Sequence, residues 1–517
     1  MKSKVGPALP NDSASPLDAR RQTMVGVIDI GSNSLRLVLY DRIGRAPNVL
    51  FNEKVMCALG RSLNSTGRLN PDGVALARDN IERFVMLAHQ LGVSRLDVLA
   101  TSAVRDAEDG PGFVAEIERR TGVKVAVIDG MREGRLSASG VLAGIPDADG
   151  ITGDLGGGSV ELAITGPQPS GFVVSLPIGP LRLLEAAGDP HTAIDKAIET
   201  VPWLAQATDK PFYAVGGAWR ALARIHMEHN HYPLHVIQNY ALERPEAELF
   251  LGLIERQSRR SLEKIMGFSR KRLETVPLAA YVLAKLVTKI KPSRIVFSAF
   301  GLREGHLFEL LSPAEQRQDP LLIACADMAR VNPRFGAGGD ELLAWTDALF
   351  PNETPAQRRL RRAAALVSDI GWSEHPDYRD EQIFMRCLRM PVPGIDHGGR
   401  VFIANALHAR YGGEAEMPIV AGTRGLLDEA VFLQARAVGH AFRLAYTLTG
   451  GAPGLLHRTS VALEAASVAL TIPEHTAIYT GEAVQRRLDA LGRALGRRTL
   501  IRTEDSPPPK KRAGRDG

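Results

Sequence analysis

The sequence predicts an α/β protein whose first part consists of two related halves facing each other across a cleft, followed by a mainly helical region. Three observations lead to this prediction. Two strand–turn–strand segments share one plan, in which Asp29 or Asp154 precedes a turn of small residues. β-Prone and helical segments alternate as far as residue 311. After residue 320 the apolar residues follow mostly helical periodicity.

The composition is that of a soluble protein with several domains. The 517 residues are too many for one hydrophobic core, and two to four domains are expected. Hydrophobic residues make up 44% and charged residues 23% of the chain, which is ordinary for globular proteins. The net charge of +5 is compatible with a polyanionic partner, but many enzymes share it.

The cysteines and the apolar runs predict a cytoplasmic location. Cys57, Cys325 and Cys387 are widely spaced, so they indicate neither a disulfide framework nor a metal motif. No apolar run has the length needed to cross a bilayer, and the chain starts without a secretory signal. We therefore expect no membrane partner.

The first half is expected over residues 24–148, after a disordered arm at 1–23. It opens with the first hairpin and a third strand at 49–56. Asn70 and Pro71 suit the N-cap and first turn of a helix. The remaining elements are expected as a strand at 96–101, a helix at 111–121, a strand at 123–128 and a helix at 129–143.

The second half is expected over residues 149–312. After its hairpin, strands are expected at 171–176, 211–217 and 294–298, and helices at 218–226, 244–266, 277–290 and 305–311.

Beyond a boundary near 312–319, a mainly helical region is expected over 320–503, and then a mobile basic tail at 504–517. Helices are expected at 320–330, 339–349, 355–370, 379–388, 400–410, 425–448 and 482–496, with β-prone pieces at 460–472 and 476–479.

The two hairpin turns are candidate phosphate loops. Glycines at 156, 157 and 158 let backbone N–H groups close on an anion. Asp154 at the mouth of that turn can hold a hydrated Mg²⁺. An ordinary hairpin with a bulge is the alternative for either turn. The candidate phosphate-binding residues of the two turns are Ser32, Asn33, Ser34, Gly156, Gly157, Gly158 and Ser159.

Five segments carry a resemblance to a known family. They are VIDIGSNS at 27–34, ATSAVRDA at 100–107, GDLGGGSVE at 153–161, AVGG at 214–217 and GLREG at 301–305. In this order and spacing the sequence resembles the exopolyphosphatase / guanosine pentaphosphate phosphatase family over about residues 24–311. The resemblance implies the actin-like ATPase fold, with two ribonuclease-H-like subdomains and a central cleft. It also implies a C-terminal domain similar to HD phosphohydrolases, and a homodimer.

The resemblance implies that Glu133 is the general base, which accepts a proton from the attacking water. The family usually carries two adjacent acids here, whereas this chain has Arg132 before Glu133. A glutamate favoured by the helix dipole is the alternative. Arg105 is expected to bind a phosphate group; a salt bridge to Asp106 or Asp109 is the alternative.

A Mg²⁺ site is expected at Asp154, Glu161 and Asp29. For Glu161 the alternative is a solvated strand residue. Gly216 and Gly217 are expected to border the substrate site, or else to permit close packing of a strand and a helix. We expect the neighbouring residues Arg303 and Glu304 to form a structural ion pair.

The C-terminal region lacks part of the HD motif. Ser368 stands where a histidine would precede Asp369, and His375, His397 and His408 are scattered. We therefore predict that this region has lost a dinuclear metal site and serves in binding or dimerisation.

The leading hypothesis is a Mg²⁺-dependent exopolyphosphatase that removes orthophosphate processively from linear inorganic polyphosphate. Hydrolysis of guanosine pentaphosphate (pppGpp) is the second hypothesis, because both substrates offer the same terminal group. An actin-like ATP-binding kinase or switch and a non-catalytic polyphosphate-binding regulator are further alternatives. No specific nucleic-acid partner is expected. Candidate channel cations are Arg36, Lys264, Arg270, Lys271 and Arg272.

Overall fold

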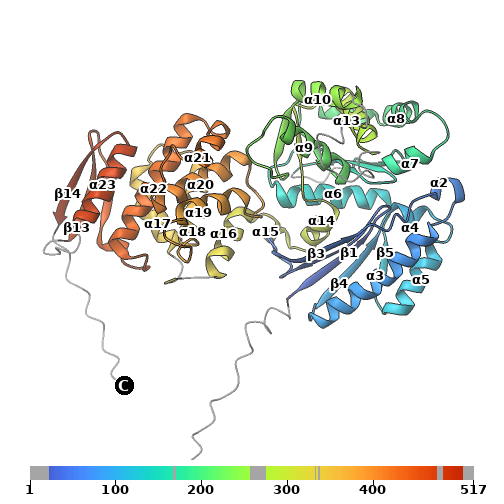
Figure 1. The fold of residues 1–517 in the computed structure, drawn as a ribbon, viewed down its shortest axis with the longest axis horizontal. Helices are drawn as coiled ribbons and strands as arrows, with labels where there is room; N and C mark the ends of the chain where they lie inside the picture. Colours follow the sequence, from blue (N-terminus) through green and yellow to red (C-terminus); the bar gives the residue numbers. More distant parts are fainter. Residues whose placement is uncertain are drawn as a thin grey trace, which may run out of the picture. The chain divides into compact units, whose positions relative to one another are not determined.

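The computed structural model describes residues 23–166, 171–256, 275–331, 334–335, 338–473 and 481–504. The chain forms two compact units (Figure 1). The N-terminal unit runs to His229 and resumes at Ala241–Gln318, and the C-terminal unit comprises Asn230–Tyr240 and the residues from Asp319 onward. The short segment Asn230–Tyr240 thus belongs to the C-terminal unit although it lies inside the expected second half.

The first sheet of the N-terminal unit has the strand order β3-β2-β1-β4-β5. Its strands β1, β2 and β3 are antiparallel neighbours, and β4 and β5 continue the sheet in parallel with β1. The strands are β1 (Val25–Ile30), β2 (Leu35–Tyr40), β3 (Val49–Val55), β4 (Arg95–Ala100) and β5 (Val125–Val127), with helices α2 (Leu63–Thr66), α3 (Pro71–Gln90), α4 (Ser102–Asp106) and α5 (Gly110–Thr121).

Both faces of the central strand β1 are buried, which explains why β1 is apolar on both sides. Ile28 and Ile30 pack in one core cluster with Ile81 and Phe84 of α3. Val25 and Val27 pack in another cluster on the opposite face. The predicted helix start at Pro71 is confirmed, although the side chain of the N-cap residue makes no capping hydrogen bond.

The second sheet repeats the plan of the first. Its order is β10-β11-β9-β6-β7-β8, in which β6, β7 and β8 are antiparallel and β9 and β11 continue in parallel. The strands are β6 (Gly150–Leu155), β7 (Val160–Thr165), β8 (Val173–Leu176), β9 (Phe212–Val215), β10 (Tyr240–Glu243) and β11 (Arg294–Phe297). The helices are α7 (Pro180–Glu185), α8 (Pro190–Glu199), α9 (Gly217–His229), α10 (Arg244–Arg256) and α13 (Val276–Ile290), with a 3₁₀ turn η1 (Pro202–Ala207).

Two helices, α6 (Gly130–Gly144) and α14 (Leu302–Glu309), pack closely between the two sheets (Figure 1). Their backbones approach at glycines. A Cβ atom built on Gly305 would lie 1.7 Å from the carbonyl oxygen of Leu136, and one on Gly140 would lie 2.1 Å from that of Gly301. Only glycine permits this approach. A short helix, α15 (Pro313–Gln316), ends the unit.

The C-terminal unit is mainly helical and carries a small sheet of order β12-β13-β14. Helix α20 is buried along nearly its whole length and packs against α19 and α22. The helices are α16 (Pro320–Val331), α17 (Gly339–Thr346), α18 (Pro355–Leu366), α19 (Arg379–Arg389), α20 (His397–Tyr411), α21 (Pro418–Thr423), α22 (Glu429–Thr449) and α23 (Glu482–Ala494); 3₁₀ turns are η2 (Asp347–Leu349), η3 (Arg424–Leu426) and η4 (Leu456–Arg458), and strands are β12 (Ser460–Leu463), β13 (Ser467–Pro473) and β14 (Arg498–Glu504).

Most predicted helices and strands are confirmed, with shifts of a few residues at their ends. The elements that were not predicted include α2, α4, α8, α15, α21, β10 and β14. The arm at 1–22, the end of the helix predicted over 244–266, the β-prone piece at 476–479 and the tail at 505–517 lie outside the described residues. In the part of the chain that the structure describes, no helix combines the length and apolarity required to traverse a bilayer.

Candidate active site

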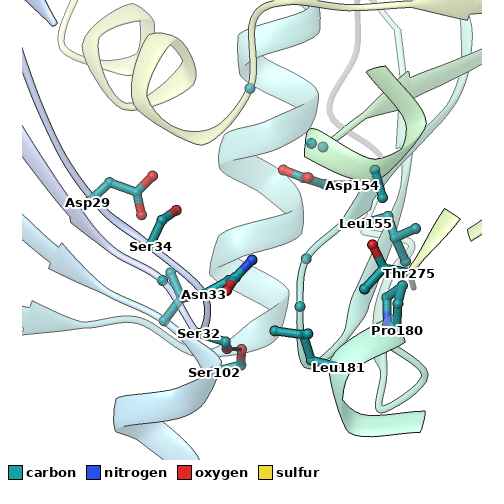
Figure 2. Close-up of a pocket in the computed structure, with 18 of the residues that line it drawn as sticks. Asp29, Ser32, Asn33, Ser34, Ser102, Asp154, Leu155, Pro180, Leu181 and Thr275 are labelled. Carbon is teal, nitrogen blue, oxygen red and sulfur yellow. Dashed lines mark hydrogen bonds between the residues drawn. The ribbon is translucent and has the colours of Figure 1, made fainter. Parts of the chain in front are cut away.

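A cavity of about 560 Å³ lies within the N-terminal unit, between the two sheets. Figure 2 shows Asp29 and Ser34 on one side and Asp154 and Leu155 on the other. The cavity brings together these residues singled out in the sequence: Asp29, Ser32, Asn33, Ser34, Arg36, Glu133, Asp154, Gly156, Gly157, Gly216 and Gly217.

The two hairpin turns approach each other at the end of this cavity. The hydroxyls of Ser32 and Ser102 lie 2.8 Å apart. A Cβ atom on Gly157 would lie 3.4 Å from the Cβ of Ser32, and one on Gly158 would lie 3.1 Å from the Ser102 hydroxyl oxygen. Small residues therefore let the turns of the two halves come into contact while their backbones remain open to the cavity.

Gly216 is a position where the backbone requires glycine. Its φ is +105°, and a Cβ atom there would lie 2.4 Å from the carbonyl oxygen of Leu155. Strand β9 therefore passes into α9 directly beside the second hairpin. Gly217 begins α9, and nothing within 4 Å opposes a Cβ there. Gly216 therefore both borders the cavity and permits close packing of the backbone.

Glu133 lies in the first turn of α6, whose N-cap Asp129 accepts a hydrogen bond from the Arg132 N–H at 2.7 Å. Its side chain is buried, and it lines the cavity. Burial raises the pKa of Glu133 well above the usual value, and the carboxylates of Glu161 and Asp154 raise this pKa further.

Arg105 departs from its expected place. It is not among the described residues that line the cavity. Its Nη1 lies 3.4 Å from Oε2 of Glu133 and donates to the carbonyl oxygen of Ile128 at 3.1 Å, while its Nε contacts Asp106 at 3.1 Å. The alternative salt bridge to Asp106 is therefore present. Arg105 therefore contacts Glu133, and its charge lowers the pKa of this glutamate. Its binding to a phosphate group stays a prediction.

Asp154 and Glu161 lie directly opposite each other on the antiparallel strands β6 and β7. Asp154 accepts a hydrogen bond from the Ser137 hydroxyl, and burial raises its pKa. Glu161 accepts a hydrogen bond from Ser175 at 2.7 Å, and burial raises its pKa to about 7. The alternative of a solvated Glu161 is wrong, because only 1% of this residue is exposed.

Asp29 and Arg303 form an ion pair at 2.8 Å in the cavity wall. Glu304 lies farther from Arg303, at 3.9 Å, and instead accepts hydrogen bonds from the Gly301 N–H at 2.9 Å and the Tyr40 hydroxyl at 3.0 Å. The expected ion pair between residues 303 and 304 is thus secondary to one that joins the first hairpin to α14.

Several basic residues of the cavity were missed by the sequence analysis. Arg220 follows the glycine pair on α9, and Arg303 follows Gly301 on α14. Each arginine stands just after a glycine motif at the start of a helix. This pattern is the sequence signal that could have identified these arginines as cavity residues. The basic residues that line the cavity are Arg36, Lys54, Arg61, Arg220 and Arg303.

The remaining candidates lie elsewhere. Gly158 lines a smaller hollow beside the cavity, and Ser159 is buried behind the turn, so neither is among the described residues of the cavity wall. Ser159 therefore does not face the cavity as expected. Lys264, Arg270, Lys271 and Arg272 lie outside the described residues.

The acidic residues are compatible with a Mg²⁺ ion that is only partly held by protein. Among the described residues, no group of three or more His, Cys, Asp or Glu side chains is placed to hold a metal. Mg²⁺ is commonly bound by one or two carboxylates together with water and substrate phosphates. Asp154 in the cavity wall fits this pattern. Glu161 lies opposite Asp154 on the neighbouring strand, but it is not among the described residues that line the cavity.

In the C-terminal unit, two arginines bind Asp369, the acid of the HD-like position. Asp369 accepts hydrogen bonds from Arg334 at 2.9 Å and from Arg410 at 2.9 Å. The hydroxyls of Ser368 and Tyr446 lie 2.9 Å apart. Two guanidinium groups therefore hold the carboxylate that an HD motif would offer to a metal. The loss of a dinuclear site remains a prediction.

Replacing Asp369 with asparagine is expected to lower the free energy of unfolding by about 2–4 kcal/mol, because Arg410 would remain as a buried charge without its acid. The Arg410 side chain is 9% exposed and stacks on Tyr446 at 3.8 Å from the ring centroid. Chemical denaturation followed by circular dichroism measures the loss. Asp377→Asn, at an exposed position, is the control. Equal stability of the two variants would contradict the role of Asp369.

Comparison with known proteins places the chain in a family. The model of the Ppx/GppA phosphatase family matches residues 27–314, and that of the exopolyphosphatase C-terminal domain matches residues 321–501. The chain therefore belongs to the Ppx/GppA phosphatase family, whose members hydrolyse phosphoanhydride bonds.

Three curated relatives span different parts of the chain. Retrograde regulation protein 2 of Saccharomyces cerevisiae is 25% identical over 448 residues, covering 78% of this chain and 75% of the relative. Exopolyphosphatase 1 of Mycobacterium tuberculosis is 31% identical over 162 residues, or 31% of this chain and 47% of the relative, so the match spans about half of it. A guanosine-5′-triphosphate,3′-diphosphate pyrophosphatase of Photobacterium profundum is 23% identical over 408 residues, covering 74% of this chain and 80% of the relative.

The fold class is confirmed by a solved structure. The crystal structure of an exopolyphosphatase from Cytophaga hutchinsonii aligns with a TM-score of 0.50 and 24% identity, covering 56% of this chain and 97% of that one. Two actin-like α/β subdomains followed by a helical C-terminal domain are thus the architecture of this chain.

Proposed function

We propose that this protein is a Mg²⁺-dependent exopolyphosphatase, which hydrolyses the terminal phosphoanhydride bond of linear inorganic polyphosphate. The main support is that two small-residue turns, one from each half, converge on a single cavity with the buried Glu133. Among the described residues, five basic side chains line the same cavity and match a substrate whose charge is carried by phosphate.

In this proposal the turns bind and orient the terminal phosphate. Backbone N–H groups near Ser32–Ser34 and at Gly157 donate to its oxygens, and Arg220 and Arg303 offset its charge. The N–H of Gly156 closes the turn by donating to the carbonyl oxygen of Ser159 at 2.9 Å. Because the phosphoryl group is held in place, one water can be aligned opposite the leaving oxygen. Glu133 accepts the proton that this water loses. A raised pKa makes Glu133 a stronger base near neutral pH, provided that it is ionised.

Mg²⁺ would be held by Asp154 and Glu161 together with phosphate oxygens, and Asp29 would lie close to it. When bound, the ion would offset negative charge on the phosphates. Asp29 is already paired with Arg303, so its part in metal binding is smaller than the sequence suggested. Orientation of that arginine toward the cavity is the role we propose for Asp29.

Hydrolysis of pppGpp is the second candidate. The cavity also has apolar wall residues, including Leu155, Leu181 and Val276, which can accommodate a nucleoside portion. A relative that matches over most of its length is named for this type of substrate. The terminal phosphate would occupy the same place in both cases.

The family resemblance leads to two further proposals. One is a cytoplasmic location. The other is a homodimer, which a measurement of the molar mass by light scattering would test.

A phosphate-release assay with long-chain polyphosphate, tripolyphosphate, pppGpp and ATP separates these functions. We expect Mg²⁺-dependent release from polyphosphate with a kcat/KM that exceeds the value for pppGpp. A higher value for pppGpp would favour the second candidate. Tight ATP binding with turnover of ATP alone would indicate the kinase or switch, and binding of polyphosphate without any release would indicate a regulator.

Replacing Arg105 with methionine is expected to move the acidic limb of the pH profile of kcat/KM to higher pH. The base acts only when ionised, so activity rises as pH increases through the pKa of Glu133. Arg105 lowers this pKa, and its removal raises it. Arg182→Met is the matched control, since Arg182 pairs with Asp106 and not with Glu133. An unchanged limb in Arg105→Met would contradict the coupling.

A further inference from the structure

A second hollow, of about 290 Å³, lies in the C-terminal unit against the helices α22 and α23. It shares no residue with the candidate active site. Arg436, His440 and Arg493 supply its polar groups, whereas Phe432, Leu433 and Ala490 supply apolar walls. Concave sites with apolar walls and a few converging polar groups are typical of small-ligand sites.

The surroundings of this hollow are strongly positive. The charges of Arg436, Arg443, Arg493 and Arg487 all act on His440. Arg486 and Arg487 likewise act on Arg443. Nearby acids are few: Glu416 acts on Arg436, Asp380 on Arg443 and His408, and Asp489 on Arg493.

These acids leave much of the positive charge unpaired. Asp380 lies 3.7 Å from His408, and Asp489 is engaged by Gln485 and Thr499. Across the described ranges, no ion pair is formed by Arg443, Arg487 or Arg493. Like charges gathered this closely repel one another, and a bound anion would relieve the repulsion.

One polar atom at the hollow also lacks a partner. The Nδ1 atom of His440, which lines the hollow, is buried and has no hydrogen-bond partner among the residues that the structure describes. Beside it Arg436, 9% exposed, is held in place by donating to the carbonyl oxygen of Gly413 at 2.8 Å, and it lies 3.2 Å from Nδ1 of His408. A fixed guanidinium and an unsatisfied imidazole nitrogen at the wall of one hollow are suited to an oxyanion.

We propose that this hollow is a binding site for a small phosphate-class anion, held by Arg436, His440 and Arg493 and reinforced by the charge of Arg487. The phosphate group can belong to an inorganic oligophosphate or to a nucleoside monophosphate, whose base would pack on the apolar walls. The site is separate from the proposed catalysis and does not depend on it.

Histidine-ring NMR on the full-length protein tests this proposal, because the signal reports on His440 itself. The ring signal is assigned by its loss in His440→Gln. Pyrophosphate, AMP and sulfate are titrated separately. We expect a saturable shift of the His440 signal with pyrophosphate or AMP and a much weaker response to sulfate. Of pyrophosphate and AMP, the probe that binds more tightly identifies the source of the phosphate group.

The double variant Arg487→Ala/Arg493→Ala is expected to weaken this binding on the order of tenfold or more. Arg493 is exposed and Arg487 is partly exposed, and neither belongs to the buried face of α23, so we expect the double variant to fold. The control is Arg497→Ala/Arg498→Ala, which removes the same charge from exposed residues beyond the hollow. No shift with either phosphate probe, an equal response to sulfate, or equal weakening in both double variants would overturn the proposal.

Discussion

Replacing Glu133 with glutamine is expected to lower the rate of phosphate release by about 10²–10⁴-fold and to change substrate affinity little. Glutamine has nearly the same shape, but it cannot accept the proton that the attacking water loses. Glu133 is buried, lines the cavity and carries a raised pKa, so its environment already favours proton transfer near neutral pH. Steady-state release and equilibrium binding of tripolyphosphate measure the two effects separately.

Glu309→Gln is the matched control for this experiment. Glu309 is bound to Arg132, the neighbour of Glu133, but it is not among the described residues of the cavity wall. Its replacement removes one negative charge near the same helix end without touching the proposed base. If Glu133→Gln retained turnover like that of Glu309→Gln, Glu133 would not be the base.

Replacing Gly305 with alanine is expected to lower the free energy of unfolding of the N-terminal unit by roughly 2–4 kcal/mol. The new Cβ would lie 1.7 Å from the carbonyl oxygen of Leu136 and 2.7 Å from the backbone nitrogen of Gly140, so α6 and α14 must separate. Because α6 carries Glu133 and α14 carries Arg303, we also expect reduced activity. Hydrogen exchange of α6 peptides, compared with the wild type, measures the local loss.

Gly112→Ala on α5 provides the contrast. This glycine is also helical, but nothing lies within 4 Å of the place that an added Cβ would take, and alanine favours the helix by up to about 1 kcal/mol. Equal exchange in the two variants would contradict the close approach of α6 and α14. A loss confined to Gly305→Ala would show that the helix pair fixes the geometry of the cavity.

Local patterns predicted the hairpins, most helices and the helix that carries Glu133, because these features depend on residues that are neighbours in sequence. The turn after Asp154 needs three small residues in a row, and α6 needs a capping Asp129. Such requirements can be read directly from a sequence.

Long-range partners could not be predicted in the same way. The pair of Asp29 and Arg303 and the placement of Arg220 depend on how distant helices pack. The segment Asn230–Tyr240 joins the C-terminal unit through Tyr232, whose hydroxyl lies 2.8 Å from Nδ1 of His397. No periodicity within the segment indicates that contact.

The role of Arg105 illustrates the same difficulty. The sequence showed an arginine after a strand and suggested a phosphate ligand. In the structure its guanidinium donates to the carbonyl oxygen of Ile128 and contacts Glu133. Which of two acceptors an arginine takes is decided by tertiary packing and not by the local motif.

The most direct measurement is a crystal structure of the Glu133→Gln variant with tripolyphosphate and Mg²⁺. We predict that the terminal phosphate lies between the turns at Ser32–Ser34 and Gly156–Gly157, with the side chain at position 133 facing the terminal phosphorus through one water. A terminal phosphate bound elsewhere in the molecule, or a side chain at position 133 that points away from it, would contradict the proposed mechanism.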